Sequence, residues 1–164
     1  MEAEKQNRKI LYNRASTMLI FLQGQDEHGV YGQIGNGYLV ERVAFHGAGD
    51  LVLKLDQICD WIGSPHRVAD PRMMNAKMMQ DFQKRQGEHP EVSQSNLYAN
   101  MNLDAYVESV SAMETVVVCV EFRQNASMQG RVIGGLTNDQ SVSFRSALEL
   151  MRMFDAVRLQ KEEA

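Results

Sequence analysis

This sequence has few cysteines, a small net charge and no long apolar run. Two cysteines in 164 residues, Cys59 and Cys119, argue against a disulfide framework and fit a reducing compartment. The net charge of −4 provides no global basic field that would attract nucleic acid or an anionic membrane. The longest apolar runs, such as residues 18–22, are far shorter than the ~20 residues that cross a bilayer. The first 14 residues are charged and lack the apolar core of a signal peptide. We therefore expect a cytoplasmic protein with no membrane partner.

Common motifs of metal, phosphate and nucleophile chemistry are missing as well. The four histidines stand at positions 28, 46, 66 and 89, so no two have the i, i+3 or i+4 spacing of a helical metal site. Neither cysteine belongs to a CxxC pair, and the chain has no GxGxxG, GxxxxGK[ST] or GxSxG. The sequence therefore predicts no metal, no cofactor and no catalytic residue.

The composition is that of a globular domain. Hydrophobic residues make up 44% of the chain and charged residues 23%, and 164 residues are enough for one ordinary domain with a real core. Eleven methionines stand against one tryptophan. Methionine fills irregular core gaps and also lines adaptable binding surfaces, and we expect most of these residues to be core.

Residues 114–160 have the pattern of three strands followed by a helix. The strings TVVVCV and SVSF have the β-branched and alternating residues of strands. Ser146 precedes Glu149 by three residues, which is the spacing of a capping box; the glutamate then reaches back to the cap. The buried stripe of the helix is predicted to be Leu150, Met151, Phe154 and Val157.

Residues 16–63 show the same pattern. An apolar run over residues 16–22 predicts the first strand, and the following QGQDEHG predicts a turn. Alternation over residues 30–34 and at Val43 and Phe45 predicts two more strands. From Ala48 the apolar period becomes helical, and the helix should end near Gly63.

The two segments align with each other at an offset of 98 residues. Thr17 falls on Thr115 and Gly32 on Gly130; after one inserted residue, FHGAGDLVLKLD falls on FRSALELMRMFD. Two generic βββα units can match to this extent by chance, but the shared order of elements favours duplication. We therefore predict an α+β fold: an internal duplication of a βββα unit, with antiparallel sheets each backed by a helix. Because each half is small, the halves should share a core and form a single compact domain, possibly with pseudo-twofold symmetry.

Residues 64–113 are predicted to be a Met-rich, partly helical insertion between the units, and residues 1–15 an N-terminal arm. One helix should start at Asp70 and Pro71 and end before residues 86–90. The helical spacing continues at Leu103, Tyr106, Val107 and Val110, although nearby asparagines disfavour helix. The insertion either covers a face of the sheet or is mobile.

The most distinctive polar segment is FRQNASMQGR, residues 122–131. Together with the start of the following helix it offers many hydrogen-bond donors, and the candidate binding residues are Arg123, Gln124, Asn125, Ser127, Gln129, Arg131 and Arg145. Alternatively, the segment is an ordinary hairpin turn. In that case its asparagine and serine bond local backbone, and the arginines are solvated or pair with Glu121 and Glu149.

Two resemblances involve this segment. Asn125, Ser127 and Gly130 fit the N-x-S-x-x-G half of the motif by which PilZ domains bind cyclic di-GMP, which implies a nucleotide-binding hairpin. The R-x-x-x-R half is missing, because no arginine lies between Arg85 and Arg123. The strings FRQNASMQG and FRSALEL also resemble a group of short bacterial proteins with the same signature. That resemblance implies a bacterial βββα module and carries no activity with it.

From these patterns we expect a non-enzymatic binding or adaptor protein that acts through contacts with another protein or with further copies of itself. Copy two has Arg123, Arg131 and Arg145 where copy one has Gln25, Gln33 and His46, a divergence expected when one half keeps a binding role. One alternative is nucleic-acid or nucleotide binding through the hairpin of the second unit, which is possible but not favoured. Another is an enzyme of unrecognised type.

Overall fold

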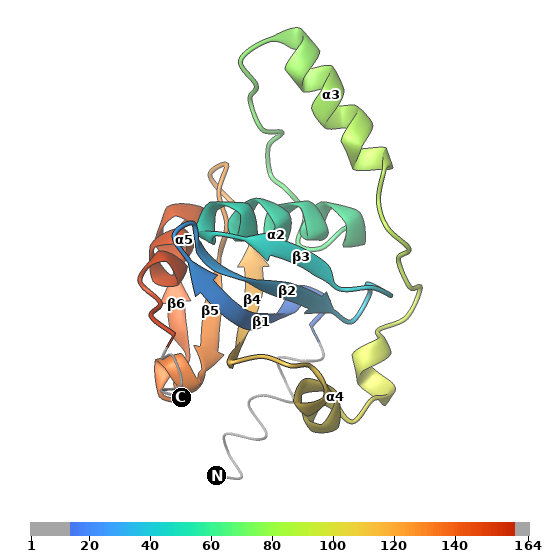
Figure 1. Ribbon diagram of the computed structural model, residues 1–164. Helices are drawn as coiled ribbons and strands as arrows, with labels where there is room; N and C mark the ends of the chain where they lie inside the picture. The colour runs from blue at the N-terminus through green and yellow to red at the C-terminus, as the bar shows by residue number, and fades with distance from the viewer. Residues whose placement is uncertain (1–13, 160–164) are drawn as a thin grey trace.

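The protein is built on one six-stranded antiparallel sheet with the strand order β3-β2-β1-β4-β5-β6 (Figure 1). The computed structural model describes residues 14–159, so most of the expected N-terminal arm and the end of the chain lie outside the described residues. The strands are β1 (Thr17–Asp26), β2 (Gly29–Asn36), β3 (Val43–His46), β4 (Glu114–Phe122), β5 (Gln129–Gly134) and β6 (Val142–Phe144). The predicted α+β class is confirmed, and the two sets of three strands share a single sheet.

A β-bulge interrupts each long hairpin at a corresponding place. The register shifts between Leu22 and Gly24 in β1, and between Val120 and Phe122 in β4. β1 therefore continues to pair with β2 as far as Asp26, with its register shifted by the bulge. The prediction that the whole of QGQDEHG is a turn was wrong, because a bulge lets a strand absorb one extra residue and keep pairing.

A glycine stands near each bulge, where the neighbouring strand comes too close for a side chain. A Cβ atom on Gly32 would lie 1.8 Å from the carbonyl oxygen of Phe21. A Cβ atom on Gly130 would lie 2.0 Å from the carbonyl oxygen of Cys119. Both positions therefore require glycine for the strands to pair as they do.

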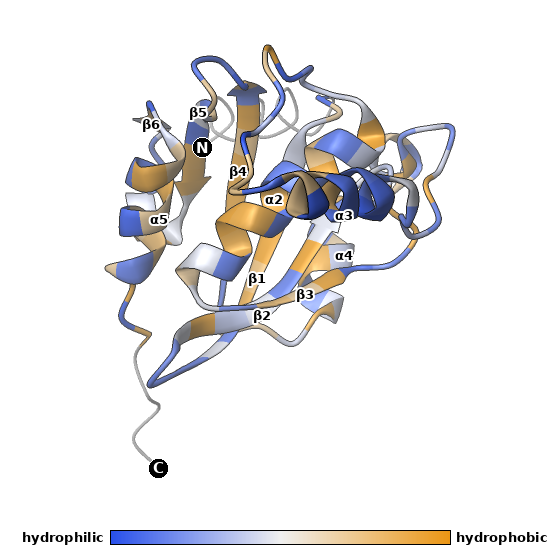
Figure 2. Cartoon of the chain, turned by 90° about the horizontal axis from the view of Figure 1, so that it is seen from above, coloured by the Kyte–Doolittle hydropathy of each residue, from blue (hydrophilic) through white to orange (hydrophobic). Residues whose placement is uncertain are grey.

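Helices α2 (Ala48–Ile62) and α5 (Ala147–Asp155) cover one face of the sheet and pack against each other (Figure 1). The apolar stripes of both helices enter one core with the inward residues of β1 and β4; the helical members of this core include Leu51, Leu55, Ile58, Leu150 and Phe154. In Figure 2 the central strands beneath α2 are largely hydrophobic (orange), whereas α2 and α5 carry both hydrophobic and hydrophilic residues. Fully burying one such side chain contributes about 1.5–3 kcal/mol, so this layer is the main source of stability.

The helix ends follow the predicted signals with one difference. Gly63 adopts the left-handed conformation (φ 70°) and ends α2. Ser146 Oγ accepts the Glu149 amide at 3.1 Å, but the Glu149 carboxylate accepts the amide of Arg145, not that of the cap residue. In the first unit Asp50 accepts the amide of His46 in the same way, at 2.9 Å.

Part of the insertion covers the opposite face of the sheet. The 3-10 helix η1 (Leu97–Asn100) and helix α4 (Leu103–Ser109) lie there. They pack Tyr98, Tyr106 and Val107 against Leu19, Phe21 and Val117. Of the two possibilities for the insertion, covering the sheet is correct for this part, because its apolar side chains complete a second core.

Helix α3 (Ala76–Gly87) projects from the body, and none of its side chains is buried (Figure 1). It starts later than predicted. Asn75 accepts the Met78 amide at 2.9 Å and caps the helix, so the residues from Asp70 to Met74 remain outside it. No helix in the described part of the chain has the length and apolar character needed to span a membrane.

Candidate functional site

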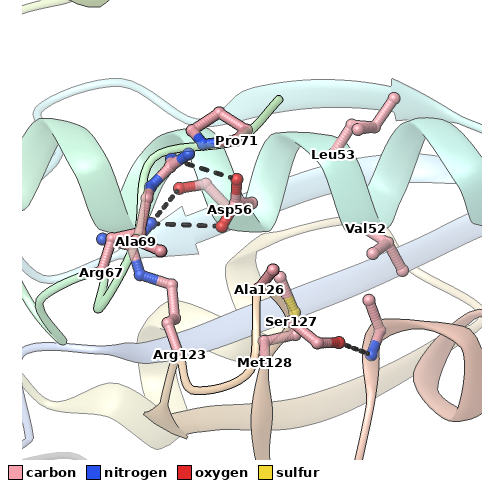
Figure 3. A pocket seen from close by; sticks show the side chains of 11 residues that line it. Val52, Leu53, Asp56, Arg67, Ala69, Pro71, Arg123, Ala126, Ser127 and Met128 are labelled. Carbon is pink, nitrogen blue, oxygen red and sulfur yellow. Dashed lines mark hydrogen bonds and ion pairs between the residues drawn. The ribbon is translucent and has the colours of Figure 1, made fainter. Parts of the chain in front are cut away.

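A small pocket opens between α2, the segment after α2, and the β4–β5 turn (Figure 3). Its volume is about 200 Å³. The walls are mostly apolar, and the apolar members are Val52, Leu53, Ala69, Pro71, Ala126, Met128 and Ala147. The polar members are Asp56, Arg67, Arg123 and Ser127. We call this site the turn pocket.

Arg123 lines the pocket and is 4% exposed. Its Nη1 donates to Asp60 Oδ1 at 2.6 Å and to Asp56 Oδ1 at 3.1 Å. Its Nε donates to the carbonyl oxygen of Pro65 at 2.8 Å. Arg67 pairs with the other oxygen of each carboxylate, so two arginines and two aspartates form one closed network.

The network holds Arg123 in its charged form. Burial by itself would lower the pKa of the Arg123 guanidinium, but its hydrogen bond and charge interaction with Asp60, helped by Asp56, raise that pKa instead. A buried charge needs such partners, because its desolvation is otherwise very costly. Arg123 is therefore committed to the fold and does not present a free cation to the pocket.

The β4–β5 turn has an unusual backbone. Asn125 and Ala126 both have positive φ, at 56° and 54°, and the Ser127 amide donates to the carbonyl oxygen of Gln124 at 3.0 Å. Consecutive positive φ values are those of a type I′ turn, in which the second central position usually holds glycine. The side chain of Gln129 closes the turn by bonding both the amide and the carbonyl of Gln124.

Ser127 connects this turn to helix α5. Its Oγ accepts the backbone amide of Ala147 at 2.8 Å, and Ala147 is the first residue of that helix. Ser127 therefore satisfies one of the amides that a helix start leaves unpaired. The hydroxyl has a structural partner on the wall of the pocket.

The other two candidate arginines also have acidic partners. Arg131 Nε lies 2.8 Å from Glu121 Oε1, and Arg145 Nη2 lies 2.6 Å from Glu149 Oε2. The Arg145 side chain is largely exposed, and its hydrogen bonds lower the pKa of Glu149 to about 2. Neither arginine lines the turn pocket.

Of the seven predicted residues, the structure thus brings Arg123 and Ser127 to the pocket wall, and places Gln124, Asn125 and Gln129 in the adjoining turn. The sequence analysis missed Asp56, Asp60 and Arg67. The aligned residue of the first unit makes an equivalent contact in the structure: Gln25 corresponds to Arg123, and it bonds the carbonyl oxygen of Val157 and the amide of Leu159 just after α5. In each unit this position reaches the end of the other unit's helix.

The thiols and other ligating groups offer little further chemistry. Burial raises the pKa of the Cys59 thiol to about 12 and also raises the pKa of Cys119. Within residues 14–159, no three side chains of His, Cys, Asp or Glu are placed to hold a metal ion. The turn pocket is therefore best described as an apolar recess beside a satisfied ion-pair network.

Comparison of the chain with family models, with curated proteins and with solved structures gave no significant match to any of them.

Proposed function

We propose that the chain is a non-enzymatic binding or adaptor protein, and that the turn pocket and its aliphatic rim contact another protein. The observation that carries this proposal is the exposure of two large aliphatic side chains: Leu53 in the pocket lining, and Val68, next in the chain to two lining residues; we call these two side chains the rim. Leu53 is 71% exposed and Val68 is 72% exposed. Leu53 lines the pocket, and Val68 stands between its lining residues Arg67 and Ala69. Apolar side chains gathered on a surface are typical of protein contact sites.

The size of the pocket supports a protein partner over a small ligand. Small-molecule sites usually enclose ~300–1,000 Å³, whereas the turn pocket holds about 200 Å³. One or two side chains of a partner protein would fill it. The nearby charges of Asp56 and Arg67 are already paired with each other, so a partner can cover them without separating an ion pair.

The pairing of the arginines favours this function over nucleotide or nucleic-acid binding. Each of Arg123, Arg131 and Arg145 is paired with a carboxylate of the same chain. Phosphate binding through these arginines would have to displace those carboxylates. Measurable binding of RNA, DNA or a cyclic dinucleotide at low salt, lost in Arg145→Ala and Arg131→Ala, would favour the nucleotide alternative instead.

The pocket residues also favour binding over catalysis. The described lining residues include no histidine, cysteine, lysine or tyrosine, and the one hydroxyl accepts the amide of Ala147. A general base or an activated nucleophile would need a group free to exchange a proton.

The test compares three variants as bait in lysate of the source organism. Leu53→Asp and Val68→Asp place a charge on the rim, and Leu136→Asp places one on an apolar side chain that does not line the pocket. We expect wild type and Leu136→Asp to recover the same stoichiometric partner and the two rim variants to lose it. Recovery of that partner by all four proteins, with thermal melts showing that all are folded, would exclude the rim as the contact surface.

We also infer that the two βββα units arose by duplication. In the pairing of β1 with β4, Thr17 lies opposite Cys119. If the two units are exchanged at the 98-residue offset, this pair becomes Thr115 and Phe21, which also lie opposite each other. The same exchange leaves the central pair Leu19–Val117 unchanged. With the one inserted residue, it also carries Gly32–Phe45 onto Gly130–Phe144. This agreement of register supports a pseudo-twofold axis at Leu19 and Val117. The test is a comparison of related sequences. If the two units become less alike as more relatives are compared, duplication is not supported.

A further inference from the structure

Helix α3 has an outer face that no residue in the described part of the chain covers. Met79, Phe82 and Gln86 are half-buried toward Arg67 and the end of α2, while Lys77 and Lys84, seven residues apart, share the opposite face. Helix α3 holds three cationic side chains, those of Lys77, Lys84 and Arg85, and one acidic side chain, that of Asp81, which lies on the same face between the two lysines. In the described part of the chain, Lys77, Lys84 and Arg85 form no ion pair. Figure 2 shows α3 as mainly hydrophilic.

The structure also suggests that α3 needs a further contact. A helix of twelve residues is marginal in water when its packing is weak. Here the Asn75 cap and one half-buried side support it, together with the Arg67 guanidinium, which lies 5.5 Å from the centre of the Phe82 ring. The exposed Met78, 41% accessible, flanks the basic face and adds apolar area for an additional contact.

A groove of complementary character lies on the other side of the sheet. It has a volume of about 440 Å³ and lies between α4, the start of β4 and the end of β5. Its floor is apolar, with Val107, Val117 and Ile133. Its charged lining residues are Asp104, Glu108, Glu114 and Asp139, and none of its lining residues among 14–159 is a cation. We call this the acidic groove. Within residues 14–159, Asp104, Glu108 and Glu114 form no ion pair.

We propose that the basic face of α3 docks in the acidic groove of a second copy of this chain. Lysine and arginine side chains would pair with Asp104, Glu108 and Glu114, and Met78 would cover part of the apolar floor. Complementary charge of this kind selects a partner and speeds its association. The two surfaces lie on opposite sides of one molecule, with α3 beyond α2 and α4 beneath the sheet, so α3 cannot reach the groove of its own chain (Figure 1).

The contact joins two different surfaces, so it is heterologous. Each copy keeps one free helix and one free groove after pairing, and further copies add until a ring closes or a filament grows. This inference does not depend on the turn pocket, which lies on another part of the surface. Loss of the rim contact would leave the assembly in place, and loss of the assembly would leave the rim contact in place.

The first measurement is the mass of the full chain by light scattering and sedimentation velocity over a range of concentrations. At about 0.05 M salt we expect the average mass to rise with concentration above the 18.6 kDa of one chain. At about 0.5 M salt we expect the single-chain mass, because exposed charges are then screened. A single-chain mass at low salt and high concentration overturns the proposal.

The decisive measurement uses two charge-reversal variants. One carries Lys77→Glu, Lys84→Glu and Arg85→Glu on α3; the other carries Asp104→Lys and Glu108→Lys in the groove. Each is expected to be monomeric alone. When they are mixed, the native helix of the second fits the native groove of the first, and the reversed helix of the first fits the reversed groove of the second, so we expect assembly to return at low salt. A mixture that stays monomeric contradicts a helix-to-groove contact.

A combined variant and matched controls separate this contact from misfolding. The chain that carries all five reversals has complementary surfaces again, so we expect it to regain assembly at low salt. Arg152→Glu and Glu41→Lys reverse exposed charges elsewhere and should assemble like wild type. Folded, monomeric behaviour of the combined variant would show that the charges do not pair as proposed.

Discussion

Arg123 Nη1 lies 2.6 Å from Asp60 Oδ1, although 63 residues separate them in the chain. The contact crosses from the β4–β5 turn to the last turns of α2, and so from one βββα unit to the other. Because the contact is buried, replacing Arg123 tests how much this contact contributes to holding the two units together.

Replacing Arg123 by methionine should lower the free energy of unfolding by roughly 3 kcal/mol, because the Asp60 carboxylate would lose a buried partner. Arg123→Lys should lie between wild type and Arg123→Met, since lysine keeps the charge but not the planar fork. Urea unfolding measures both. The exposed Arg152→Met is the control, and an Arg123→Met protein within about 0.5 kcal/mol of it would contradict the role of the network.

The two bulge glycines give a second prediction. Gly32→Ala and Gly130→Ala each force a methyl group against a backbone carbonyl, so we expect each to cost at least about 3 kcal/mol or to prevent folding. Gly49→Ala is the matched control. A Cβ atom there meets nothing within 4 Å, and alanine in helix α2 should raise stability by about 0.5–1 kcal/mol. Circular dichroism melts rank the three, and a well-folded Gly130→Ala protein would refute the close approach.

Glu149 supplies a pH-dependent prediction. The Arg145 side chain, and then its backbone amide, lower the pKa of Glu149 from 4.5 to about 2. A lowered folded pKa means that the interaction stabilises the protein fully above pH 4.5, and that this contribution is lost as the pH falls toward 2. Carboxyl NMR titration of Arg145→Ala should show the pKa of Glu149 moving back toward 4.5. Arg152→Ala should change it little, and an unmoved value in Arg145→Ala would assign the shift to another cause.

The buried thiols give a fourth prediction. Because burial raises the pKa of Cys59 to about 12, almost no thiolate exists at pH 8, and the Cys119 pKa is also raised. A thiol reagent should therefore label neither cysteine in the native protein and both in urea. Mass spectrometry counts the adducts. Rapid native labelling of Cys59 would mean that the end of α2 opens easily.

Much of the fold follows from local patterns in the sequence. The period change at Ala48, the stop at Gly63 and the cap at Ser146 each predict an element that the structure contains. Local patterns were less useful where a single side chain decides the boundary. Pro71 permits a helix start, but the Asn75 side chain makes the cap, and the helix begins after Asn75.

The candidate site was less predictable, because its partners are remote in the chain. The polar turn was visible as a string, and it does border the pocket. Asp56 and Asp60 sit four residues apart in a predicted helix, where they look like solvated residues beside the apolar stripe. Only the crossing of β4 and α2 in space brings Arg123 between them, and no local pattern records that crossing.

The stacking of Arg67 on Phe82 has a structural consequence. The same guanidinium that covers the ring of α3 also pairs with Asp56 and Asp60, and these carboxylates hold Arg123 at the end of β4. The segments on either side of α3 are fixed as well, by bridges from Arg67 to Arg123 and from Val92 to Leu39. Through Arg67, one continuous series of contacts therefore joins the projecting helix to the end of a central strand.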